Sequence, residues 1–187
     1  MTSALYIDPN GPYPALGLDC WDATRNAEDY AGPGPVIAHP PCGPWGQLRQ
    51  FCTKQDPAIG PIAVQQVRRW GGVLEHPAWS TLWRHCSLPT PSEEGDLPGV
   101  AGNEWSVCVD QSRWGHPAQK RTWLFFVGVR PADLPPLPPR RAAVAVIRPR
   151  ANGMGAVHVP KSQRHLTPPA FASWLLASMS SLAERVR

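Results

Sequence analysis

The sequence has no long hydrophobic run. None of its 187 residues falls in an apolar stretch of the roughly 20 residues that cross a bilayer. The first five residues, MTSAL, also lack the basic and apolar regions of a signal peptide. We therefore expect a cytoplasmic protein that makes no membrane contact.

Lysine is scarce, and charge of either sign is low. Only 17% of residues are charged, and 3 Lys stand against 15 Arg in a chain of net charge +4. Arg makes planar, bidentate contacts with phosphate, so this bias fits a nucleic-acid partner such as DNA. A GC-rich genome favours the same codons, so composition alone leaves both explanations open.

The five cysteines include no Cys-x-x-Cys pair. This spacing excludes a disulfide framework and a standard zinc module. The zinc deaminase signature, His-x-Glu with Pro-Cys-x-x-Cys, is also missing. His39 and Cys42 have ligand-like spacing, but no second close pair accompanies them, so we expect no metal.

Proline and glycine are abundant. The 24 Pro and 16 Gly fill 40 positions, which excludes a helix bundle or coiled coil and predicts short elements joined by stiff turns. Apolar residues make up 42% of the chain, enough for a core. We expect one domain over residues 1–187, with a reduced N-terminal part at 1–35 and a proline-rich connector region at 130–160.

Short apolar segments alternate with helical ones. Strands are predicted at residues 4–8, 36–38, 73–74, 105–109, 122–129 and 144–147, and helices at residues 22–30, 61–70 and 168–186. The first helix would be capped by Asp22 and the last by Thr167. The alternation indicates an α/β sheet, in which ligands bind where strands end.

A thiol follows the predicted strand at 36–38. The segment His39-Pro40-Pro41-Cys42 has two prolines that stiffen the chain just before Cys42. A rigid loop at a strand end can present a nucleophile, and His39 or a nearby Arg could lower the pKa of the thiol. The alternative is a small buried residue in a proline-rich turn.

Two further segments carry polar side chains at strand ends. Glu75 ends the strand at 73–74, where burial would raise its pKa and let it hold a proton for donation. Gln119 and Arg121 precede the strand at 122–129 and, two residues apart, could point into one site. The alternatives are a Glu that caps a helix or pairs with an Arg, and an edge-strand Arg in a surface pair.

These segments, in this order, resemble motifs of the DNA cytosine-5 methyltransferases. The similar segments are Pro41-Cys42, Glu75-His76-Pro77, residues 115–121 (GHPAQKR) followed by 123–128 (WLFFVG), and residues 164–168 (RHLTP). The resemblance spans roughly residues 36–170. It implies a single Rossmann-like, methyltransferase-type sheet.

The resemblance also implies roles for individual residues. Cys42 would attack C6 of a cytosine flipped out of DNA, Glu75 would hold the ring near N3, and Arg121 would fix the base and the developing charge. Substrate binding would involve Pro41, Trp45, His76 and Gln119. The cofactor of the family is S-adenosylmethionine.

The N-terminal cofactor half is reduced. The predicted first strand leads into residues 8–14 (DPNGPYP), with no Gly-x-Gly loop, so no cofactor-binding residue is assigned. Three alternatives stay open: a minimal methyltransferase-like enzyme, a pyrimidine-modifying enzyme without S-adenosylmethionine, and a non-catalytic DNA- or protein-binding derivative. The size and the reduced N-terminal part suggest a phage or mobile-element protein, with a partner chain or homo-oligomer as a further alternative.

Overall fold

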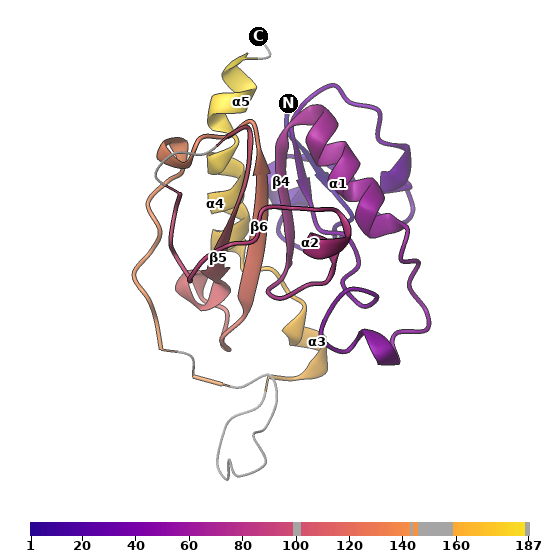
Figure 1. Cartoon of the computed structure of the whole chain (residues 1–187), viewed down its shortest axis with the longest axis vertical. Helices are drawn as coiled ribbons and strands as arrows, with labels where there is room; N and C mark the ends of the chain where they lie inside the picture. Colours follow the sequence, from indigo (N-terminus) through magenta and orange to yellow (C-terminus); the bar gives the residue numbers. More distant parts are fainter. Residues whose placement is uncertain (99–101, 143, 146–158, 186–187) are drawn as a thin grey trace.

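The chain is built around one six-stranded mixed sheet. A computed structural model describes residues 1–98, 102–142, 144–145 and 159–185. The strand order is β2-β1-β3-β4-β6-β5 (Figure 1). The strands are β1 Ser3–Leu5, β2 Asp19–Trp21, β3 Val36–Ala38, β4 Gly72–Pro77, β5 Glu104–Asp110 and β6 Arg121–Val127. The first four are parallel, and β6 is antiparallel to both of its neighbours, β4 and β5. The predicted α/β class is confirmed, and the order is compatible with a Rossmann-like arrangement.

Helices cover both faces of the sheet (Figure 1). They are α1 Ile59–Trp70, α2 Leu82–His85, α3 Lys161–Arg164, α4 Pro169–Ser178 and α5 Ser180–Arg185. Short 3-10 turns are η1 Pro14–Leu16, η2 Ala27–Asp29, η3 Arg49–Phe51, η4 Gln111–Trp114 and η5 Pro131–Asp133. Side chains of α1 and α2 pack into one buried cluster and those of α4 into another, so a core lies on each face of the sheet. Among the described residues, no helix is long and apolar enough to cross a bilayer.

The α1–β4 connection matches its prediction. Ala63 and Val67 of α1 are fully buried, as the helical spacing predicts. Gly71 ends the helix and Gly72 begins β4 with φ at +127°. A Cβ on Gly72 would lie 2.0 Å from the backbone oxygen of Val36. Only glycine therefore allows β4 to approach β3 this closely.

The N-terminal part differs from its prediction. The first strand ends at Leu5, and β2 was not predicted because it is only three residues long and half-buried. Asp22 accepts the backbone N–H groups of Thr24 and Arg25 at 2.9 Å each, as an N-cap does. Residues 22–30 nevertheless form turns and η2 rather than a continuous helix, because Asn26 has a left-handed backbone with φ at +51°, which a right-handed helix does not accommodate.

The C-terminal helix also differs. The predicted helix at 168–186 is divided into α4 and α5 at Met179. The hydroxyls of Ser178 and Ser180 donate to carbonyls in the last turn of α4, and such bonds compete with the helix. Pro168, not Thr167, occupies the N-cap position.

Only half of the predicted strand at 144–147 lies among the described residues, since residues 146 and 147 fall outside them. In the described half, Ala145 forms an isolated bridge with Ala118. The isolated bridge provides no evidence for a seventh strand.

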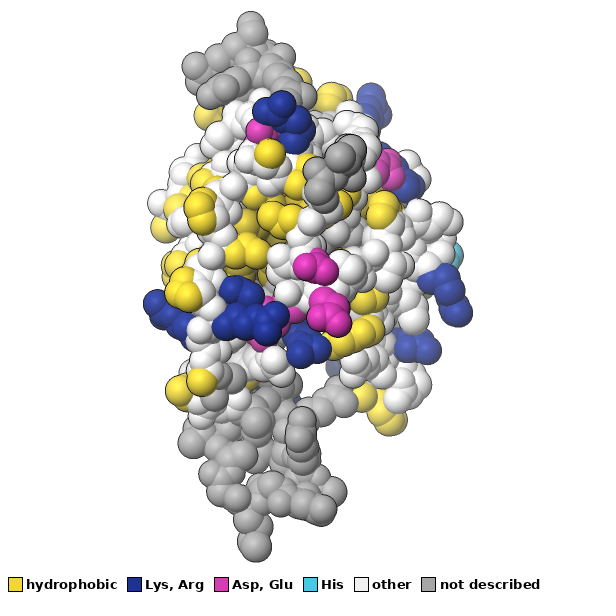
Figure 2. All heavy atoms as spheres, turned by 60° about the vertical axis from the view of Figure 1, so that its left-hand side comes forward, with side chains coloured by type: hydrophobic (Ala, Val, Ile, Leu, Met, Phe, Trp, Pro, Cys, Tyr) yellow, Lys and Arg dark blue, Asp and Glu magenta, His cyan; other side chains and the backbone are white. Residues whose placement is uncertain are grey.

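The proline-rich segment 130–142 runs along one side of the sheet (Figure 1). Trp174 Nε1 donates to the Pro135 carbonyl at 3.1 Å, and Arg113 donates to the Pro138 carbonyl at 2.6 Å. Arg113 also pairs with Glu94 at 2.9 Å. Figure 2 shows this side, where apolar side chains gather beside groups of both charges. Side chains of the core therefore bind this part of the connector to the domain.

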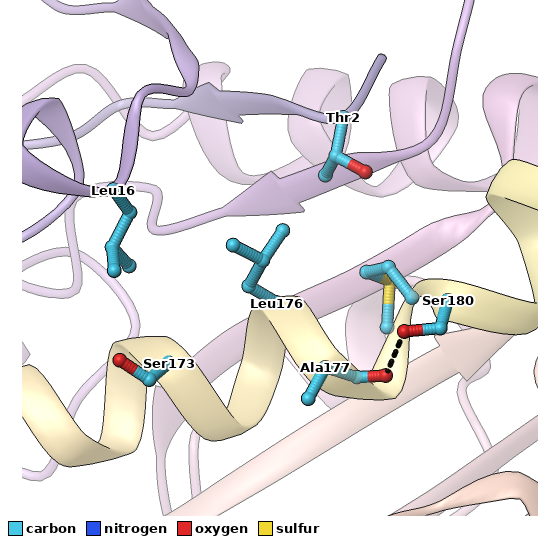
Figure 3. Close-up of a pocket in the computed structure, with 7 residues that line it drawn as sticks. Thr2, Leu16, Ser173, Leu176, Ala177 and Ser180 are labelled. Carbon is cyan, nitrogen blue, oxygen red and sulfur yellow. Dashed lines mark hydrogen bonds between the residues drawn. The ribbon is translucent and has the colours of Figure 1, made fainter.

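A cavity of about 330 Å³ opens beside α4 (Figure 3). Its lining comes from α4, the start of α5, η1 and the chain just before β1: Thr2, Leu16, Ser173, Leu176, Ala177, Met179 and Ser180. None of the predicted site residues lines it.

The close approach at Gly72 gives a stability test. We expect Gly72→Ala to lower the free energy of unfolding by about 3 kcal/mol or more, because the new methyl group meets backbone and the residue keeps a positive φ. Gly102→Ala is the matched control, since its Cβ meets nothing within 4 Å. Its effect should stay within about 0.5 kcal/mol. Equal urea midpoints for the two variants would contradict this account of the β3–β4 contact.

Candidate functional site

The candidate site lies where the strand order reverses. β1 and β3 are neighbours in the sheet. The chain continues from β1 to β2 on one side of this pair and from β3 to β4 on the other side. Loops after β1 and β3 meet there at the carboxyl edge of the sheet, the usual place for ligands in such folds. Because β6 is antiparallel to β4, its first residues lie at the same edge.

Glu75 is the centre of the site. It lies in β4 and is only 9% exposed. Its Oε1 accepts a hydrogen bond from Gln111 Nε2 at 2.9 Å, and its Oε2 lies 3.1 Å from His39 Nδ1. Gln111 also donates to Thr122 Oγ1 at 2.9 Å. Both carboxylate oxygens therefore have a partner.

His39 connects Glu75 to a buried tyrosine. The Tyr13 hydroxyl lies 2.5 Å from His39 Nε2. Burial, and then the charge of Glu75, raises the pKa of Tyr13 well above its usual value, so this hydroxyl stays protonated. When His39 is neutral, Tyr13 donates to Nε2 and the ring proton sits on Nδ1, facing Glu75.

The charge state of Glu75 differs from the prediction. Burial opposes ionisation, but the hydrogen bond and charge of His39, followed by the charge of Lys120, lower the pKa of Glu75 to about 2. The expectation of a raised pKa was wrong because the carboxylate is paired. At neutral pH Glu75 accepts hydrogen bonds and does not donate them.

Cys42 lies at the surface beside this carboxylate. Its side chain is exposed, yet the surrounding loops remove enough water to raise the pKa of the thiol, and the charge of Glu75 raises it further. The charge of Lys120 lowers it. The resting thiol is therefore protonated at neutral pH, with a carboxylate and an ammonium group acting on it in opposite directions.

Lys120 is the cation that the sequence reasoning missed. Its Nζ donates to the carbonyls of His165 and Leu166 at 3.3 and 3.0 Å. Its backbone N–H donates to Asp110 at 3.0 Å, which fixes the chain just before β6. Burial lowers the pKa of Lys120, while the charges of Glu75 and Cys42 oppose that shift. Among the described residues, two of its three N–H groups donate to backbone carbonyls, and the third has no such partner and could donate to a ligand.

Arg121 does not join Cys42 and Glu75. Glu75 pairs directly with Leu124 across the β4–β6 ladder, so Thr122 shares its face of the sheet. Arg121 lies on the opposite face, with its guanidinium 5.7 Å from the Trp79 ring centre. Successive side chains at the start of β6 point to opposite faces of the sheet, so Lys120, and not Arg121, lies on the face of Glu75. Gln119 is exposed at the same edge.

Two other predicted substrate-binding residues, His76 and Trp45, pack against other aromatic side chains. His76 is fully buried near Trp83, and burial lowers its pKa to about 4. The Pro41 carbonyl lies close enough to oppose that shift, but among the described residues neither ring nitrogen of His76 has a partner of normal hydrogen-bond geometry. The Trp45 ring packs 4.9 Å from that of His85. Pro41 is half-buried beside Cys42.

Turns follow the strand ends where S-adenosylmethionine would bind. After β1, Asp8 Oδ1 accepts the Asn10 N–H at 2.9 Å. After β2, Asp22 Oδ1 accepts the N–H groups of Thr24 and Arg25 at 2.9 Å each. The Trp21 ring is covered by the Arg25 guanidinium at 3.8 Å. Residues 8–14 contain no Gly-x-Gly loop, so no residue is assigned to this cofactor.

The part of the chain that the structure describes contains no group of three or more His, Cys, Asp or Glu side chains able to hold a metal ion. Comparison of the chain with models of protein families, with curated proteins and with solved structures found no match. Function is therefore inferred from the chemistry of the site.

The low pKa of Glu75 predicts acid sensitivity. The folded-state pKa is about 2, below the ordinary 4.5, so ionised Glu75 stabilises the fold above pH 4.5. That stabilisation is lost as the pH falls from 4.5 towards 2. We expect Glu75→Gln to unfold more readily at pH 7 and to lose less stability over this window in urea titrations.

Exposed Glu93→Gln is the control and should keep the wild-type pH profile. His76 adds a separate loss of stability as the pH falls from 6.5 to 4, because its pKa in the folded protein is lowered to about 4. An unchanged acid limb in Glu75→Gln would contradict the pairing of this carboxylate.

The opposing charges on Cys42 predict changes in its reactivity. We expect Lys120→Met to raise the pKa of the Cys42 thiol and to slow its alkylation by iodoacetamide at pH 8 about threefold to tenfold. Rates are measured for each cysteine by mass spectrometry. Cys52, a half-buried cysteine of the same loop, serves as the internal control. Equal slowing at both cysteines would indicate a general structural change.

Proposed function

We propose that this chain forms a covalent bond from Cys42 Sγ to C6 of a cytosine extruded from DNA. This is the nucleophilic step of the DNA cytosine-5 methyltransferases that its motifs resemble. The supporting observation is that Glu75 in β4 and Lys120 just before β6 both act electrostatically on the Cys42 thiol at one edge of the sheet.

The two charged groups complement the polar edge of cytosine. Ionised Glu75 can accept a hydrogen bond from the exocyclic amino group, and the remaining N–H of Lys120 can donate to the ring carbonyl. A pyrimidine with this donor and acceptor pattern would lie with C6 towards the exposed thiol. The thiol and the two recognition groups would then act on one ring.

In the chemical step, sulfur forms a bond to C6 and the C5–C6 π bond breaks. The thiol proton leaves the sulfur and is taken up at ring nitrogen N3, so the net step is an addition that conserves charge. With a pKa of about 2, Glu75 is too weak a base to take up the thiol proton, so its role is to hold the amino group of the ring while the proton passes to N3. The addition leaves C5 electron-rich.

No methyl-transfer step is included, because the segment after β1 lacks the Gly-x-Gly loop that would mark a site for S-adenosylmethionine. A second candidate is a non-catalytic DNA-binding derivative of the fold. The raised pKa of Cys42 favours this candidate, since the resting thiol is not ionised. The two candidates differ in whether a covalent adduct forms.

Trapping on DNA distinguishes them. A short oligonucleotide carries 5-azacytosine, whose ring nitrogen in place of C5 makes C6 more electrophilic and keeps the amino group. We expect a denaturation-resistant complex with the intact mass of protein plus DNA. Cys42→Ser should abolish it, because the nucleophile is lost.

Cys52→Ser is the matched control, from the same loop, and should form the adduct at the wild-type rate. Unmodified cytosine measures the background. Failure of the wild-type protein to form an adduct, with both single- and double-stranded oligonucleotides, would overturn the proposal. An adduct that survives in Cys42→Ser would do the same.

A further inference from the structure

An exposed aromatic side chain follows β4 at the carboxyl edge. Trp79 is 52% exposed, while most of the aromatic side chains that the structure describes are buried or partly buried. Its ring centre lies 6.4 Å from that of Trp123, which is only 9% exposed. The core thus supports one side of this indole and leaves the rest of it in solvent.

Trp79 is also held in a strained conformation. Its φ is +62°, in the left-handed region that a bulky side chain adopts at a cost of about 1–2 kcal/mol. Backbone bonds fix the turn on both sides: Ala78 N donates to Arg121 O at 3.0 Å, and Ser80 N donates to Pro77 O at 3.2 Å. A glycine would fit this position without strain. A bulky residue that is kept in a strained backbone conformation is consistent with a functional role for its exposed ring.

A cation accompanies the ring. Arg121 is exposed, and its guanidinium lies 5.7 Å from the Trp79 ring centre. Within the described ranges, no acidic side chain forms an ion pair with Arg121. The chain offers a contrast at Trp21, where Arg25 covers the ring but also pairs with Asp19. The charge of Arg121 is therefore available to a phosphate.

We propose that Trp79 and Arg121 bind a single strand of DNA, with one unpaired base stacked on Trp79 and its phosphate paired with Arg121. Stacking on an aromatic side chain accepts any base, and an adjacent cation holds the backbone. The surface shares its edge with Cys42 and Glu75 but lies on the other face of the sheet. It deepens the proposed function by assigning the contact to the nucleotides that flank the reacting base.

The test measures binding of a fluorescent oligo-dT of about 15 nucleotides, by anisotropy at low salt. We expect Trp79→Gly to weaken binding about tenfold or more, because stacking on one ring is lost. The same variant should be as stable as the wild-type protein in urea, or more so, since the strain is relieved. Trp79→Phe keeps a ring and should recover most of the affinity.

Arg121→Gln should weaken binding and reduce the salt dependence by about one phosphate contact. Arg25→Gln, which alters the paired Trp21–Arg25 stack, is the matched control and should bind within twofold of the wild-type protein. The inference is overturned if Trp79→Gly binds oligo-dT as the wild-type protein does. It is also overturned if Trp79→Gly only shifts a monomer–dimer equilibrium in sedimentation.

The oligo-dT contains no cytosine, so this result is independent of the covalent step. Trp79-dependent binding without a 5-azacytosine adduct would overturn the proposed chemistry and leave this surface in place. An adduct with no Trp79 dependence of oligo-dT binding would overturn only the surface.

Discussion

The buried carboxylate of Glu75 holds the carboxyl edge of this sheet together. Through His39 it reaches the loop after β3 and, one bond further, Tyr13 in the loop after β1. Through Gln111 it reaches the turn after β5 and the start of β6. An ionised group that is nine-tenths buried persists only where hydrogen bonds and opposite charge replace water. The same partners that stabilise the fold here therefore also fix the charge of the candidate site.

That charge also acts on Cys42. In the free protein, burial raises the pKa of the thiol, the charge of Glu75 raises it further, and the charge of Lys120 lowers it. The first two influences are the stronger, which accounts for a thiol that is exposed and yet protonated at rest.

The sequence predicted best those elements whose residues are uniformly apolar or clearly periodic. β3, α1 and β6 were found close to their bounds, because burial on both faces or on one helical face leaves a readable pattern. β2 could not be found, since Asp19–Trp21 is half-buried and lacks the uniformly apolar side chains that reveal β3. Arg121 was chosen over Lys120 because i and i+2 spacing predicts which residues share a face, not which face points to Glu75. The lowered pKa of Glu75 depends on His39, 36 residues away, which local pattern does not reveal.

The antiparallel insertion of β6 between β4 and β5 explains why one edge carries two kinds of surface. In a purely parallel sheet, this edge would receive only the ends of strands and the loops that leave them. Here it also receives the beginning of β6, whose successive side chains point to opposite faces. Lys120 reaches the carboxylate and thiol on one face, and Arg121 lies beside the exposed indole on the other. The start of one strand thus places one cation on each face of the sheet, with different neighbours on the two faces.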